Sequence, residues 1–159
     1  MGKKADFAVE LFCKGHNCSQ AVLGAFCSDC KMDMDTALKL ASSFGGGMGR
    51  LREVCGALSA SFMIAGLIYG YSASEDKTAK AAHYKLIQTI AARFKEKMGS
   101  IICRNLIGAS EKDKSYVPED RTEKYYSLRP CKEIVREAAL IVEELLEDGP
   151  ERFMSDEQN

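Results

Sequence analysis

The chain of 159 residues has the length of one ordinary domain, and its 28% charged and 46% hydrophobic residues are typical of a soluble globular protein. Its formal net charge of −1 gives no electrostatic reason to expect nucleic acid or an anionic membrane surface as a partner. Seven cysteines stand out against two histidines and no tryptophan. Because seven thiols cannot all be paired internally and no secretory-signal pattern is visible, we expect a cytoplasmic protein whose thiols are reduced.

Apolar residues recur at helical spacing along almost the whole chain, and alternating strand-like runs are nearly absent. In the first third of the chain this pattern predicts helices over residues 4–14, 18–28 and about 33–44. Asn17 is a good N-cap for the second of them, and Asp33 or Asp35 caps the third. Four glycines within residues 45–49 then predict a loop, because glycine inside a helix costs backbone entropy.

The most apolar segment, about residues 53–71, predicts a central buried helix. It is shorter than the roughly 20 apolar residues that span a bilayer, so we expect no membrane insertion. Its small residues would let neighbouring helices approach closely, either within one core or in a homodimer.

The rest of the chain predicts helices over residues 74–98, 103–107 and 130–147. Residues 109–128 are polar and charged and predict a surface excursion, and residues 150–159 predict a polar C-terminal tail. We therefore expect an all-α fold in which residues 1–149 form a single compact bundle of about five to seven helices around the central apolar helix.

Four cysteines fall at predicted helix starts. They are the candidate catalytic residues, and the candidate metal ligands if a cluster is bound: Cys18, Cys55, Cys103 and Cys131. Unpaired backbone N–H groups and the positive end of the helix dipole favour a thiolate over a thiol at such positions. Nearby arginines would act in the same direction, so this pattern predicts thiols of lowered pKa. The alternative is that these cysteines are small buried hydrophobic residues.

The other cysteines form a different pattern. Cys13 and His16, followed by Cys27 and Cys30, have zinc-like spacing. The CxxC pair ends a predicted helix with no strand nearby, so we interpret these cysteines as incidental and disfavour zinc.

The glycine-rich segment is not a nucleotide-binding loop, because Arg50 stands where a dinucleotide fingerprint would have glycine and no strand precedes it. Backbone N–H groups of the candidate cofactor-binding residues could instead lie close to whatever Cys55 holds or attacks. These residues are Gly46, Gly47, Gly49 and Gly56. A flexible connector between two helices is the other interpretation.

Several separated motifs occur in a recognisable order. They are residues 17–22, residues 41–49, Cys55-Gly56-Ala57, residues 66–70, Cys103 with residues 106–108, and Cys131. Over about residues 17–140 the sequence resembles the C_GCAxxG_C_C family of redox-active proteins. The family name spells Gly-Cys-Ala-x-x-Gly, whereas here only Cys55 itself matches that core.

The resemblance implies a redox protein with four functional cysteines. One function is thiol–disulfide exchange with a partner protein or a small thiol or disulfide, which would be an oxidoreductase-like activity. Related domains occur in electron-transfer proteins that carry iron–sulfur clusters, so cluster or metal binding for electron transfer or sensing is the second. A helical scaffold with buried structural cysteines is the third. For exchange, we expect Cys55 and Cys103 to be the closest pair.

Overall fold

Helices make up nearly all the regular structure of the residues that the computed structural model describes, which are 2–110, 113 and 115–155. In chain order the segments are α1 (Lys3–Cys13), α2 (Cys18–Ala25), α3 (Met34–Ala41), the 3-10 turn η1 (Ser42–Phe44), α4 (Gly45–Met48), α5 (Gly56–Tyr69), α6 (Lys77–Met98), α7 (Cys103–Ile107), α8 (Glu123–Leu128) and α9 (Cys131–Ser155). The all-α class is confirmed. Within the described ranges, the long helices α1, α2, α3, α5, α6 and α9 form the bundle, and α4, α7 and α8 are short.

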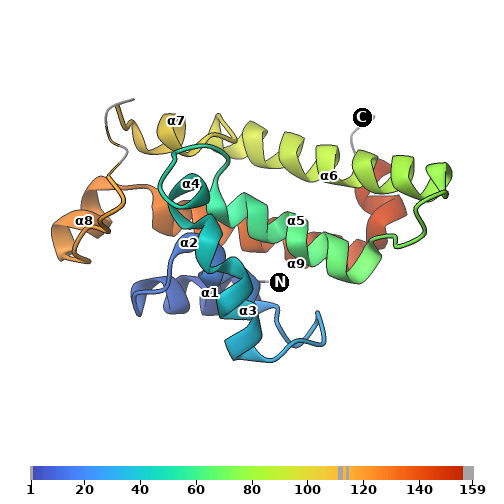
Figure 1. Ribbon diagram of the computed structural model, residues 1–159, viewed down its shortest axis with the longest axis horizontal. Coiled ribbons are helices and arrows are strands. Elements are labelled where there is room, and N and C mark those ends of the chain that lie inside the picture. The colour runs from blue at the N-terminus through green and yellow to red at the C-terminus, as the bar shows by residue number, and fades with distance from the viewer. Residues whose placement is uncertain (1, 111–112, 114, 156–159) are drawn as a thin grey trace.

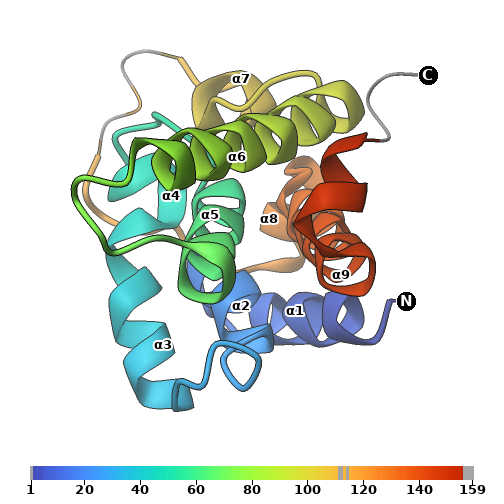
Figure 2. The same ribbon diagram turned by 90° about the vertical axis from the view of Figure 1, so that its right-hand side faces the viewer.

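Helix α5 lies at the centre of the bundle, as its apolar composition predicts. It packs against α2, α6 and α9, and α1 packs against both α2 and α9. Figure 2 shows α6 crossing above α5, with α9 to the right of α5 and α1 below them. Fully buried side chains such as Leu58 and Ile64 of α5 and Phe94 of α6 fill the core between them. Burial of these side chains supplies the main stabilisation of the fold.

Local capping chemistry fixes several helix starts. The Asn17 side chain accepts a hydrogen bond from the Gln20 N–H (2.9 Å), and the Gln20 side chain accepts one from the Asn17 N–H (3.1 Å). This capping box fixes the start of α2. Asp33, rather than Asp35, caps α3 by accepting from the Thr36 N–H (2.9 Å).

The glycine-rich segment is a regular turn and not a loose connector. Residues 46–50 all have positive φ angles, between 62° and 69°. Five consecutive left-handed residues are costly unless most of them lack a Cβ, which explains why glycine occupies three of the five. Backbone hydrogen bonds from the Arg52 N–H to the Gly46 oxygen (3.3 Å) and from the Glu53 N–H to the Gly47 oxygen (3.0 Å) close the turn.

The structure adds detail at the C-terminal side. The polar segment 109–128 is mostly exposed and contains α8, whose Tyr126 ring packs edge-on against Phe12 of α1. The expected polar tail 150–159 continues α9 through Ser155 after a break at Gly149, and Phe153 in it is fully buried. The sequence did not indicate α8 or the continuation of α9, because both segments are polar and only single aromatic residues make their contacts with the bundle. Residues 156–159 of the expected tail lie outside the described residues.

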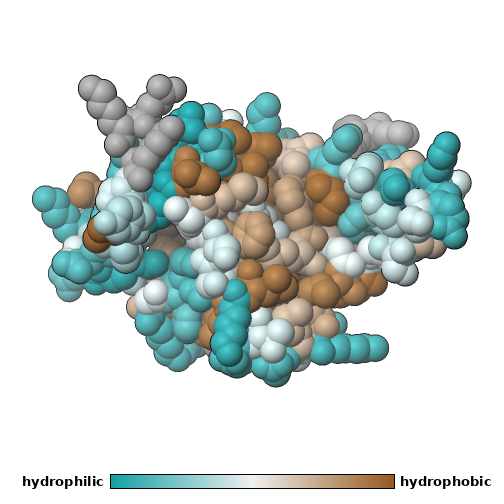
Figure 3. Space-filling model, in the orientation of Figure 1, coloured by the Kyte–Doolittle hydropathy of each residue, from teal (hydrophilic) through white to brown (hydrophobic). Residues whose placement is uncertain are grey.

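An apolar band crosses the face of the molecule that Figure 3 shows, over the middle of the bundle. Leu67 of α5 is 48% exposed, so the central helix is not covered along its whole length. No helix in the described part of the chain is long and apolar enough to cross a membrane. The homodimer stays a prediction.

Candidate functional site

The four cysteines predicted at helix starts line one small cavity of about 60 Å³. Cys18, Cys103 and Cys131 are the first residues of α2, α7 and α9, and Cys55 immediately precedes α5. The expected helix-start positions are therefore found in the structure. Residues far apart in the sequence meet here because the starts of these four helices converge beside α4 and α8, at the left-hand end of Figure 1.

A short antiparallel bridge between Val54 and Ile102 holds two of the cysteines. The Cys55 N–H donates to the Ile101 oxygen (2.9 Å), and the Cys103 N–H donates to the Glu53 oxygen (2.6 Å). Because both bonds involve the backbone of the cysteines themselves, the separation of these two residues is set by the fold.

Two of the candidate glycines are packed against the cysteines. A Cβ added at Gly47 would lie 2.5 Å from Cβ of Cys103, and one added at Gly56 would lie 2.7 Å from Sγ of Cys18. Such separations are far below van der Waals contact, so only glycine lets these cysteines approach the backbone so closely. Gly46 and Gly56 line the cysteine cavity, whereas Gly49 lines a neighbouring pocket.

The expected lowering of thiol pKa values is not found for three of the four cysteines. Burial raises the pKa of Cys131 to about 12, and it raises the pKa of Cys55 and of Cys103 above their ordinary values. Backbone N–H groups of Ala57 and Leu58 lower the pKa of Cys55 as expected at a helix start, but desolvation outweighs them. Helix position alone could not reveal this, because desolvation depends on what the rest of the chain packs over the thiol.

Cys18 is the common neighbour of the other three thiols. Among the cysteines, Cys18 contributes most to raising the pKa of Cys55, of Cys103 and of Cys131. The Coulombic effect of Cys18 on the pKa of Cys55 is larger than that of Cys103. The expectation that Cys55 and Cys103 are the closest pair stays a prediction. Cys18 and Cys131 are half-buried, whereas Cys55 and Cys103 are buried. All four are free thiols.

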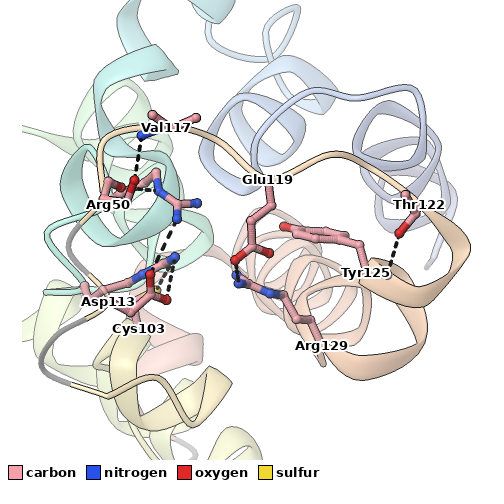
Figure 4. A network of polar contacts seen from close by, with 10 residues as sticks. Arg50, Cys103, Asp113, Val117, Glu119, Thr122, Tyr125 and Arg129 are labelled. Atoms are coloured by element: carbon pink, nitrogen blue, oxygen red, sulfur yellow. Dashed lines mark hydrogen bonds and ion pairs between the residues drawn. The ribbon is translucent and has the colours of Figure 1, made fainter.

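A buried arginine borders the cavity. Arg52 is 3% exposed, and its Nη1 lies 3.8 Å from Sγ of Cys103, whose pKa it lowers against the effect of burial. Its Nη2 pairs with Asp113 at 3.4 Å, and Arg50 reaches the same carboxylate at 3.7 Å (Figure 4). A positive charge held this close stabilises a thiolate relative to a thiol.

The segment before and within α8 covers the cavity, which the sequence did not indicate. Arg121 and Tyr125 line it, and the Arg121 guanidinium lies 4.8 Å from the centre of the Tyr125 ring and 4.5 Å from that of Phe12. Arg121 also donates to the His16 oxygen at 3.2 Å. These contacts hold the covering segment to the end of α1. Their only sequence signal is a basic and aromatic cluster within a polar stretch.

The remaining cysteines lie elsewhere. Cys13 is exposed, and Cys27 and Cys30 are half-buried against the core. Burial and the neighbouring Asp29 raise the pKa of Cys30 to about 11. None of these three lines the four-cysteine cavity.

Iron–sulfur clusters use four cysteine thiolates, so the chemistry of the donor set fits such a group. The positions of the cysteine side chains fit an iron–sulfur cluster less well than their chemistry does. Within the described ranges, no group of three or more Cys, His, Asp or Glu side chains has the geometry to hold a metal ion.

The fold and the site define an all-α protein whose distinguishing feature is a small cavity lined by four free thiols. The family model for the C_GCAxxG_C_C putative redox-active proteins matches residues 16–145, and the chain belongs to this family. No curated protein and no solved structure matches the chain.

Proposed function

We propose that this protein carries out thiol–disulfide exchange, with the disulfide formed and broken inside the four-cysteine cavity. The observation that carries the proposal is that four free thiols share one cavity, and that the half-buried Cys18 neighbours each of the other three. Such an arrangement provides one thiol for attack on an external disulfide and others to resolve the product.

The exchange proceeds in two displacements. The Cys18 thiolate attacks one sulfur of an external disulfide, forms a mixed disulfide and releases one thiolate of the substrate. Cys55 then gives its proton to the substrate thiolate already released and attacks Sγ of Cys18, which forms the Cys18–Cys55 disulfide and releases the second substrate thiolate. Two electrons pass from the protein to the substrate. Burial that raises the pKa of Cys55 keeps it protonated until the mixed disulfide has formed beside it.

Redox titration with mass spectrometry tests this function. Equilibration against dithiol–disulfide buffers of graded potential should give one two-electron transition, with a Cys18–Cys55 disulfide in the oxidised peptide map. Cys18→Ser should abolish it, whereas Cys13→Ser, which removes an exposed thiol outside the cavity, should not change it. A wild-type protein with no reversible disulfide among the four cysteines would overturn the proposal.

Cluster binding is the second candidate, because the four cysteines that line the cavity are the donor set that iron–sulfur clusters use. Stoichiometric iron with acid-labile sulfide after anaerobic purification would select this candidate over exchange. If neither property is found and Cys55→Ser changes only stability, the scaffold interpretation remains.

A further inference from the structure

A larger pocket of about 270 Å³ adjoins the cysteine cavity. The two share a wall that includes Arg52, Arg121, Tyr125 and Arg129. The cavity itself, at about 60 Å³, has room for only a few water molecules. A substrate that reaches the thiols therefore has to place most of its atoms in the outer pocket.

The outer pocket carries an excess of positive charge. Four arginines line it, and within the described ranges two carboxylates pair with them. Arg50 and Arg52 share Asp113, while Arg129 pairs with Glu119 at 2.6 Å. Figure 4 shows these two groups on opposite sides of the pocket mouth. Among the described residues, two of the four positive charges are therefore left without a carboxylate, in a hollow where screening by water is reduced.

One of these arginines has an unmet hydrogen-bonding requirement. Nε of Arg52 is buried and has no hydrogen-bond partner among the described residues, and the whole residue is 3% exposed. Its Nη1 and Nη2 already contact Cys103 and Asp113. The charge of Arg52 is therefore incompletely compensated at the wall between the two pockets, where it favours an anion.

We propose that the outer pocket binds the carboxylate of a small acidic disulfide and so selects the substrate for the thiols. The inference rests on the proposed exchange function for the identity of the substrate, whereas anion binding by the arginines does not depend on it. With the carboxylate held beside Arg129, the substrate disulfide lies against the wall that the two pockets share. The Cys18 thiolate then forms the mixed disulfide, and one acidic thiolate leaves into the outer pocket.

Two disulfide reagents, one anionic and one neutral, provide the test. One is 5,5′-dithiobis(2-nitrobenzoate), which carries two carboxylates, and the other is the neutral 2,2′-dithiodipyridine. Rates are measured at low salt in a Cys13→Ser background, and the reaction at Cys18 is followed by mass spectrometry of its peptide. The ratio of the anionic to the neutral rate cancels any change in intrinsic thiol reactivity.

Arg129→Gln should lower this ratio roughly tenfold, since it removes one charge-assisted contact. Glu119→Gln should raise the ratio, because it frees the charge of Arg129. Lys85→Gln, an exposed change on α6, should leave it unchanged. Added salt should lower the preference of the wild type for the anionic reagent.

Calorimetry with 2-nitrobenzoate separates the two proposals, because this compound has the carboxylate and no disulfide. Binding that is lost in Arg129→Gln, together with no exchange by either reagent, would support the anion site and overturn the proposed function. Exchange with both reagents, at a ratio that neither Arg129→Gln nor Glu119→Gln changes, would overturn the anion site and leave the function standing. Absence of 2-nitrobenzoate binding in the wild type would also overturn the anion site.

Discussion

Gly56 lies where helix α5 meets the thiol of Cys18. A methyl group there would approach the Phe44 oxygen to 2.5 Å and Sγ of Cys18 to 2.7 Å, and neither neighbour is the end of a flexible chain. We expect Gly56→Ala to destabilise the fold by about 1–3 kcal/mol, as overpacking does. Urea unfolding followed by circular dichroism measures the change.

Gly66 is the matched control because it lies in the same helix. Its added Cβ would meet only Nε2 of His83, at 4.0 Å. Gly66→Ala should therefore be neutral or stabilise the protein by up to about 1 kcal/mol through helix propensity. Equal effects of the two substitutions would contradict the close packing of Cys18 on Gly56.

Cys131 makes the stability of the protein depend on alkaline pH. Burial raises its pKa from an ordinary value of 9.0 to about 12, so above pH 9 the unfolded chain releases a proton that the folded chain retains. The stabilising contribution of this thiol is complete below pH 9 and is lost as the pH rises from 9 to 12. Cys131→Ala should show a smaller loss of stability over this range than the wild type, as measured by urea midpoints. Parallel curves for the two proteins would contradict a raised pKa at Cys131.

At the scale of elements, α8 and the residues before it act as a cover over the thiols. Arg121 fixes this cover through its stacking on Phe12 and Tyr125 and its hydrogen bond to His16. Such stacking contributes about 0.5–2 kcal/mol. Arg121→Ala should therefore open the cover more often, which faster hydrogen exchange in α8 and roughly tenfold faster alkylation of Cys131 would reveal. Lys124→Ala, on the exposed side of α8, should change neither rate.

The elements also show how far the sequence could predict the site. Asn17 and Gln20 cap α2 through contacts three residues apart, so the start of α2, and with it the position of Cys18, could be read locally. The rise in the pKa of Cys55 could not be predicted, because it depends on burial by segments that are distant in the sequence. The same holds for the cover, where Arg121 meets Phe12 across 109 residues. The four glycines predicted a helix break, but the left-handed turn through Gly46, Gly47 and Gly49 depends on distant packing, since Gly47 lies against Cys103.

At the scale of the whole molecule, α9 joins the cysteine cavity to the opposite end of the bundle. Cys131 is its first residue, and Phe153, after the break at Gly149, is fully buried near its end (Figure 1). The Arg93 guanidinium of α6 lies 3.9 Å from the centre of the Phe153 ring and pairs with Glu144 at 2.7 Å. These contacts attach the last turn of α9 to α6.

Phe153→Ala should destabilise the protein by about 3–5 kcal/mol, because it removes a fully buried aromatic ring. Arg152→Ala, whose side chain is 72% exposed, should change stability by less than about 0.5 kcal/mol. Since Phe153 does not line the cavity, the alkylation rate of Cys18 in the folded Phe153→Ala protein should match that of the wild type. Faster alkylation under conditions in which circular dichroism shows a folded protein would mean that α9 transmits the loss of its last turn to the thiols.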